Sequence, residues 1–187
     1  MVQNLPDTLQ SRRDRALLLL GFAGAFRRSE LVAIDLGDLE FNRDGLVVTV
    51  RRSKTDPEGQ GRRVGIPFGS HLQTCPVRAT QAWLEFLDVP SGPVFRPIDR
   101  HGHIGTSRLS DKAVALIVKR SAGAAGLPAA DLAGHSLRAG LATSAAAAGV
   151  SERAIMAQTG HRSVATVRKY IREGSLFLEN AAAKVGL

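Results

Sequence analysis

Three short segments rich in β-branched residues interrupt a chain whose other stretches have helical patterns, and this arrangement restricts the fold more than any other feature. The segments are 39–41, 46–50 and 63–66, and the turn sequences Asn-Arg-Asp-Gly (42–45) and Asp-Pro-Glu-Gly (56–59) separate them. Short strands joined by such turns usually pair with their sequence neighbours as hairpins. The sequence therefore predicts one small three-stranded antiparallel sheet.

Helical patterns lie on both sides of this sheet. A first helix is predicted over 11–26, and a short second helix is predicted to begin at Ser29 as its N-cap. Four residues of the first helix are expected to be buried: Leu17, Leu18, Leu20 and Phe22. After Pro76, helices are predicted over 77–87, 110–125, 136–148, 152–159, 164–172 and 176–185, with a loop over 90–105. The predicted fold class is mainly α (α+β): a single helical domain over 1–187 that carries one small sheet.

The charge of the chain favours a nucleic-acid partner. It contains 25 Lys and Arg residues against 17 Asp and Glu, a formal net charge of +8, and most of the basic residues are arginine. The planar fork of arginine matches phosphate oxygens in pairs. A GC-rich genome also enriches arginine, but it does not explain the net charge. Aromatic residues make up only 5% of the chain, too few for a protein that stacks single-stranded bases, so duplex DNA is the predicted partner.

Cysteine usage and hydropathy favour a cytoplasmic protein. Cys75 is the single cysteine, so no internal disulfide forms, and no Cys/His spacing is typical of a zinc site. The longest apolar run, 16–26, is well short of the roughly 20 residues that span a bilayer. It also lacks a convincing signal-peptide cleavage pattern.

The single tyrosine, Tyr170, lies in an unusually basic segment. Its neighbours in sequence include Arg162, Arg168, Lys169 and Arg172, and Gly160-His161 precedes it. A phenol has a pKa of about 10, so it needs nearby positive charge or a base to act as a nucleophile at neutral pH. A partly buried helix residue is the alternative interpretation, but it leaves the surrounding charge unexplained. We therefore treat Tyr170 as a candidate nucleophile.

Two upstream motifs and one lysine supply further groups. Arg27 lies at a predicted helix–helix corner with Glu30 three residues on, and Lys54 lies in the turn between the second and third strands. His135 and Arg138, spaced i and i+3 at a helix start, share one face of that helix. Taken singly, Arg27 and Lys54 are better explained as solvated surface charges, and a His-x-x-Arg spacing often arises by chance. Together with Tyr170 they make a phosphoryl-transfer site that needs no metal and no ATP, because arginines neutralise the phosphate and a histidine and a lysine handle protons.

These motifs resemble the signature of the tyrosine recombinase (phage integrase) family. The matching residues are Arg27-x-Ser29-Glu30-Leu31, His135-x-Leu137-Arg138 and Gly160-His161 with Tyr170 nine positions on, in the family's order. The resemblance covers nearly the whole chain. It implies the catalytic domain of a site-specific recombinase or integrase, which cleaves and rejoins duplex DNA through a 3′-phosphotyrosyl link without a cofactor.

The resemblance also implies a role for each matching residue. Arg27 and Arg138 would clamp the scissile phosphate, and Tyr170 would attack it. Lys54 would be the general acid for the 5′-hydroxyl leaving group, and His135 a proton acceptor or phosphate contact. His161 would donate to the phosphate, and Glu30 would hold the phosphate-contacting side chains in place. Further candidate DNA contacts, from charge alone, are Arg52, Arg96, Arg100, Arg162 and Arg168.

Three expectations concern the chain as a whole. Members of the family usually carry a helical core-binding domain before the catalytic domain, and this sequence begins only a few residues before the first predicted helix. Residues 175–187 are expected to dock onto a neighbouring subunit in a tetrameric assembly on DNA. Two other functions remain open: a type IB topoisomerase-like strand transferase, and a duplex-DNA-binding module that does not cut.

Overall fold

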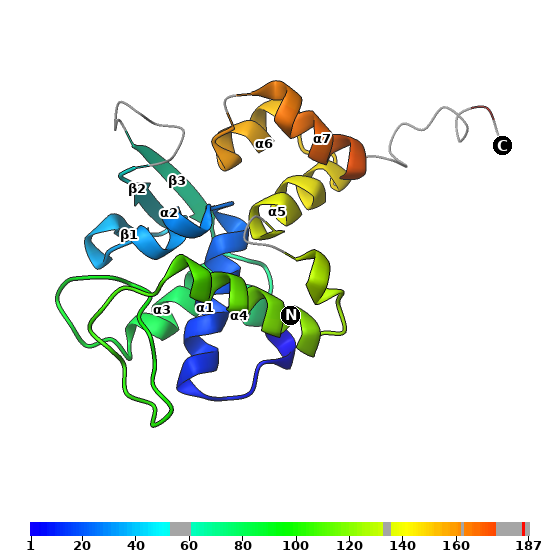
Figure 1. Ribbon diagram of the computed structural model, residues 1–187. Helices are drawn as coiled ribbons and strands as arrows, with labels where there is room; N and C mark the ends of the chain where they lie inside the picture. Colours follow the sequence, from blue (N-terminus) through cyan, green and yellow to red (C-terminus); the bar gives the residue numbers. More distant parts are fainter. Residues whose placement is uncertain (53–60, 133–135, 162, 175–184, 186–187) are drawn as a thin grey trace.

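The computed structural model describes residues 1–52, 61–132, 136–161, 163–174 and 185 (Figure 1). The fold class is confirmed as helical with one three-stranded antiparallel sheet in the order β1-β2-β3. The strands are β1 (Leu39–Asn42), β2 (Gly45–Val50) and β3 (Arg62–Pro67). Val50 pairs with Arg62 and Val48 with Val64, so alternate residues of β3 face the core.

Helices surround this sheet. They are α1 (Leu9–Ala23), α2 (Arg28–Ala33), α3 (Pro76–Leu84), α4 (Asp111–Ala124), α5 (Ser136–Ala147), α6 (Glu152–Thr159) and α7 (Val164–Gly174). Short 3-10 turns cover Val2–Asn4, Leu36–Asp38, Leu72–Thr74 and Ala129–Asp131. None of the helices in the described ranges is long and apolar enough to cross a membrane. The predicted helix over 176–185 lies outside the described residues.

The first two helices differ from their predicted bounds. Helix α1 begins after Thr8, whose hydroxyl accepts the Ser11 N–H at 3.2 Å, and it ends at Ala23 rather than Phe26. Ala25 is left-handed, with φ of 49°, which stops the helix before the predicted end. The N-cap position of α2 is Arg27, not Ser29. Phe22, predicted to be buried, is 37% exposed because it lies on the face of α1 turned toward α5, where it contacts Gly140 rather than the core.

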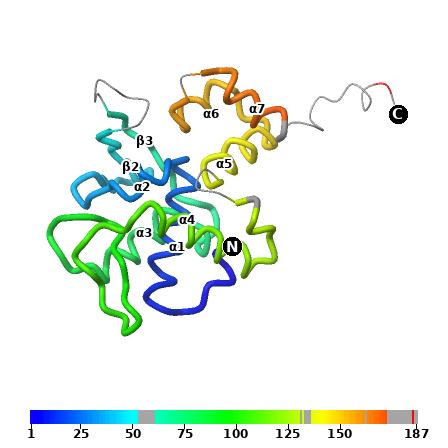
Figure 2. The backbone as a smooth tube through the Cα atoms, viewed as in Figure 1, coloured from blue at the N-terminus to red at the C-terminus, as the bar shows by residue number. Residues whose placement is uncertain are grey.

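The buried apolar residues form two clusters of unequal size. The larger one unites α1–α4 with the sheet around Trp83, Phe95 and Leu17, all buried. The smaller one lies among α5, α6 and α7 and contains Ala142, Ile155 and the half-buried Tyr170. Figure 2 shows the sheet and the α6–α7 pair on the same side of the molecule, with α1 below them. The candidate site lies where these two parts meet.

Candidate functional site

The corner between α1 and α2 places Arg27. Gly24 allows this corner because a Cβ there would come within 2.1 Å of the Phe26 ring. The backbone N–H of Arg27 donates to Glu30 Oε2 at 3.0 Å, and its Nη1 bonds Glu30 Oε1 at 2.5 Å. Glu30 itself is buried, with its side chain 1% exposed. A buried carboxylate thus fixes both the backbone and the guanidinium of Arg27.

Arg138 connects this corner to the far end of α6. Its side chain lies in the interior, 5% exposed, and Nη1 donates to the carbonyl oxygens of Ala25, at 3.0 Å, and Thr159. Its Nη2 has no hydrogen-bond partner within the described ranges. Burial, and then the positive charges of Arg27 and Arg62, lower the pKa of Arg138 to about 10, opposed by Glu30 and Tyr170. Arg138 is therefore a cation at neutral pH whose Nη2 amino group is left for an acceptor.

His161 is oriented by the threonine two residues before it. The Thr159 hydroxyl donates to Ile155 O at 2.7 Å and lies 2.7 Å from His161 Nδ1. Because that hydroxyl has a single proton, its oxygen accepts from Nδ1–H, which assigns the tautomer from the network. Nε2 is then the ring nitrogen that remains for a ligand.

The same surroundings keep the His161 ring neutral. Burial, followed by the charges of Arg138, Arg27 and Arg62, lowers the pKa of His161 to about 4. The Tyr170 ring lies beside it, with ring centroids 6.1 Å apart. The nucleophile candidate thus shares one site with three arginines and a neutral imidazole.

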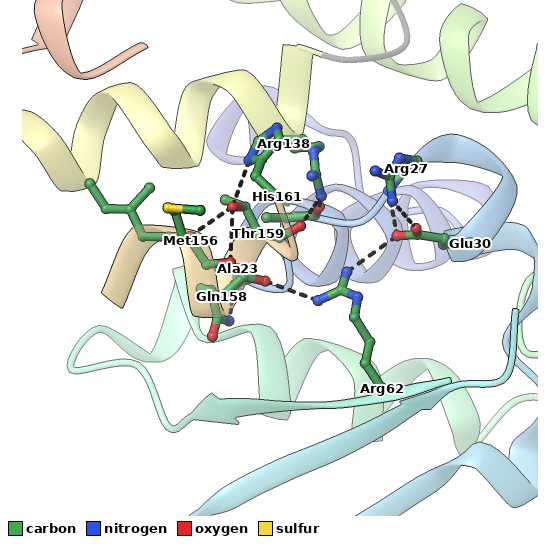
Figure 3. Close-up of polar contacts among 11 residues, drawn as sticks. Ala23, Arg27, Glu30, Arg62, Arg138, Met156, Gln158, Thr159 and His161 are labelled. Atoms are coloured by element: carbon green, nitrogen blue, oxygen red, sulfur yellow. Dashed lines mark hydrogen bonds and ion pairs between the residues drawn. The ribbon is translucent and has the colours of Figure 1, made fainter. Parts of the chain in front are cut away.

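Figure 3 shows that the polar residues of the site come from four elements. Arg27 and Glu30 come from the α1–α2 corner, Arg138 from α5, Thr159 and His161 from the end of α6, and Arg62 from β3. Arg62 was missed in the sequence because it follows the lysine turn and belongs to no motif. Strand alternation was an available signal, since residues 62, 64 and 66 share the core face of β3.

The remaining predicted residues are placed differently. Lys54, His135 and Arg162 lie outside the described residues, as does the tail over 175–184. Arg52 and Arg100 are exposed, and Arg168 pairs with Glu152 at 2.9 Å on an exposed surface. Arg96 is instead 7% exposed, and its guanidinium donates to Pro93 O at 3.0 Å and Ser91 O at 3.2 Å. These hydrogen bonds hold the Arg96 side chain against the loop that precedes α4 rather than on the exposed surface.

The Gly160 turn gives a first testable prediction. Gly160 has φ of 64°, and an added Cβ would lie 3.1 Å from Arg62 Nε; Gly149 has φ of 76° and open space around it. Gly149→Ala should lower the free energy of unfolding by about 1 kcal/mol, from left-handed strain alone. Gly160→Ala should lower it more, because the Arg62 guanidinium must also move. Denaturant unfolding of both variants measures the difference, and equal losses would show that the contact with Arg62 is unimportant.

The low pKa of His161 gives a second prediction. An unfolded chain protonates this residue near its ordinary pKa of 6.5, while the folded chain resists protonation until about pH 4. The unfolded state therefore binds more protons between these values, and folding stability falls as the pH is lowered from 6.5 to 4. With allowance for solvent screening of a half-buried ring, the loss should be on the order of 1–2 kcal/mol. Chemical unfolding of wild type and His161→Asn across this pH range measures the loss. If the free energies of unfolding of the two proteins change in parallel with pH, the prediction is contradicted.

Comparisons with known proteins identify the family of this chain. The profile of the phage integrase family matches residues 1–175, and the chain belongs to that family. The integrase/recombinase xerD homolog of Selenomonas ruminantium is 47% identical over 175 residues, covering 94% of this chain and 51% of the relative. The tyrosine recombinase XerC of Bifidobacterium longum (strain DJO10A) is 30% identical, covering 89% and 45%. The chain therefore spans about half the length of these curated relatives.

Solved structures show the same fold at low identity. The crystal structure of XerA recombinase matches with a TM-score of 0.71 at 20% identity, covering all of this chain and 63% of that one. The XerH site-specific recombinase, in a post-cleavage complex with its palindromic difH substrate, matches with a TM-score of 0.75 at 19% identity, covering 97% and 49%.

Proposed function

We propose that this chain is the catalytic part of a site-specific DNA recombinase or integrase that cleaves and rejoins duplex DNA through Tyr170. The observation that carries the proposal is the buried Nη2 of Arg138, which lacks a partner in the described part of the chain, in a site shared with Arg27, His161 and Tyr170. A buried N–H without an acceptor costs about 1–3 kcal/mol. A phosphate oxygen is the acceptor that fits two cationic side chains.

The reaction follows from these groups. The Tyr170 hydroxyl oxygen attacks the phosphorus, the bond from phosphorus to the 5′-oxygen breaks, and a 3′-phosphotyrosine forms. Arg27 and Arg138 neutralise the non-bridging oxygens as negative charge develops. Rejoining reverses the step with a 5′-hydroxyl as the nucleophile. Because one phosphoester replaces another, the energy of the broken bond is retained, and ATP is not required.

Proton transfer is assigned partly from the site and partly from the family resemblance. His161 is neutral before DNA binds, so its Nε2 can accept a hydrogen bond or a proton. The negative charge of a bound phosphate offsets the three arginines and favours the protonated ring, which then donates to a phosphate oxygen. Lys54 protonates the leaving 5′-oxygen, and His135 accepts a proton or contacts the phosphate; both assignments come from the motif positions alone.

The DNA duplex is proposed to contact the exposed arginines Arg52, Arg100 and Arg168, and Arg162 by its sequence position. Lys and Arg contacts to phosphates make binding fall steeply with salt. Residues 175–187 are proposed to join neighbouring copies of the chain on DNA. Sedimentation of the chain with DNA, with and without these residues, tests this; an identical species in both samples would contradict it.

The test of the function is covalent trapping of the chain on nicked suicide duplexes. It separates the proposed cutting enzyme from a duplex-DNA-binding module, which yields no adduct. A topoisomerase-like transferase would instead relax supercoiled plasmids of any sequence, so relaxation of plasmids with unrelated sequences separates it from a site-specific enzyme.

A further inference from the structure

Arg62 bridges the two halves of the candidate site. Its Nη2 lies 3.3 Å from Glu30 Oε2, and its Nη1 donates to Gln158 O at 3.1 Å (Figure 3). The side chain is 20% exposed, and its Nε is buried without a partner in the described ranges. One guanidinium therefore contacts α2 with one nitrogen and the end of α6 with another.

The two groups held by Arg62 control the two halves of the phosphate-binding site. Glu30 fixes Arg27 through both its backbone and its side chain. Gln158 leads directly into Thr159, Gly160 and His161. A shift of either group relative to the other would separate Arg27 from His161.

Hydrogen bonds join β3 to the end of α6, which makes such a bridge important. The cluster around α5–α7 is small, and it is distinct from the large core around the sheet. The Gln158 side chain adds a second link, since its Nε2 donates to Ala23 O at 2.8 Å and Gly65 O at 3.2 Å. Arg138, bonded to Ala25 O and Thr159 O, is the third.

Gly160 leaves room for this arrangement. Its missing side chain lets the turn lie against Arg62 Nε, Cζ and Cδ, which would be 3.1–3.3 Å from a Cβ. The guanidinium also lies 5.9 Å from the centre of the Phe26 ring, next to Arg27 in sequence. Arg62 is thus held on several sides by residues that neighbour the site, whereas Arg63 points to the opposite face and pairs with Glu40 at 2.6 Å.

We infer that Arg62 is a positioning residue of this active site, whose forked guanidinium holds the Glu30–Arg27 pair and the Gly160–His161 turn at the spacing that one phosphate requires. The inference rests on the proposed function. A lysine keeps the charge but has a single nitrogen, so it cannot bond both acceptors in this geometry.

The experiment compares Arg62→Lys and Arg62→Gln with the control Arg63→Lys, on the same strand but the opposite face. Single-turnover formation of the covalent adduct is measured on a nicked duplex at saturating protein, and the Kd for the same DNA is measured separately. Arg62→Lys should slow adduct formation about 10- to 100-fold, as expected for lost charge-assisted hydrogen bonds, and change the Kd less than about threefold. Arg63→Lys should cleave at the wild-type rate. A wild-type rate for Arg62→Lys overturns the inference, as does an equal loss in rate and binding.

A titration without DNA supplies a readout that a purely structural role would not change. Among the described residues, the charged groups acting on His161 are Arg138 from α5, Arg27 from the α1–α2 corner and Arg62 from β3. In NMR titrations, Arg62→Gln should raise the His161 midpoint, Arg62→Lys should raise it less, and Arg63→Lys should leave it unchanged. If the wild-type chain forms no adduct even with a core-binding domain fused before it, the proposed function fails, and this titration alone decides whether Arg62 acts on the site. An unchanged midpoint in Arg62→Gln then overturns the inference.

Discussion

Tyr170→Phe should abolish the covalent protein–DNA adduct while leaving DNA binding within about threefold of wild type. The substitution removes only the hydroxyl, and the ring keeps its packing against the small cluster of α5–α7, so the fold is expected to be retained. Without that oxygen, no phosphotyrosine can form, whatever the other groups do. The measurement is denaturing electrophoresis of wild-type and variant chains incubated with a pool of nicked suicide duplexes.

Each result of this assay has a clear consequence. An adduct in wild type that is absent in Tyr170→Phe supports the proposed chemistry, and sequencing the trapped DNA begins to define the target site. An adduct that persists in Tyr170→Phe would place the nucleophile elsewhere. If neither protein forms an adduct but both bind DNA in a salt-sensitive way, the assay is repeated with a core-binding domain of a relative fused before Met1. Continued absence of an adduct would favour a binding module.

Arg138→Lys should have the second largest effect, slowing adduct formation about 10²- to 10³-fold. Removing one preorganised donor to a developing negative charge typically has an effect of this size. Lysine keeps the positive charge but cannot hold Ala25 O and Thr159 O while also contacting a phosphate oxygen. The rate is measured in single-turnover reactions at saturating protein, between pH 7 and 8, where Arg138 is fully charged because its pKa is about 10.

Folding must be separated from catalysis in this experiment, because Arg138 is buried. Thermal unfolding and DNA binding of Arg138→Lys show whether the chain is folded at the assay temperature. Arg120→Lys serves as the matched control: Arg120 lies on α4, is 57% exposed and pairs with Asp14 outside the site. A folded Arg138→Lys that forms adduct at the wild-type rate would show that Arg138 does not hold the reacting phosphate.

Much of the fold could be predicted because the relevant signals are local. The helix over 152–159 has the predicted bounds, and the helix over 111–124 differs by one residue at each end. Every end of the three strands lies within one residue of its predicted position, since turn residues delimit them. The first helix was predicted less well: its end depends on Phe26 folding back over Gly24, a contact that hydrophobic periodicity does not reveal.

The order of the motifs, the single tyrosine in its basic segment and the small sheet between helices all follow from the amino-acid sequence. These are properties of composition and of spacing within one element. In contrast, the burial of Arg96, the partial exposure of Phe22 and the place of Arg62 in the site depend on how distant elements pack together. Arg62 and Gln158 are 96 positions apart, and their contact exists because the sheet and α6 meet at a polar junction. Strand alternation gives the face on which Arg62 lies, but the group it meets across that junction is fixed by how the two parts pack.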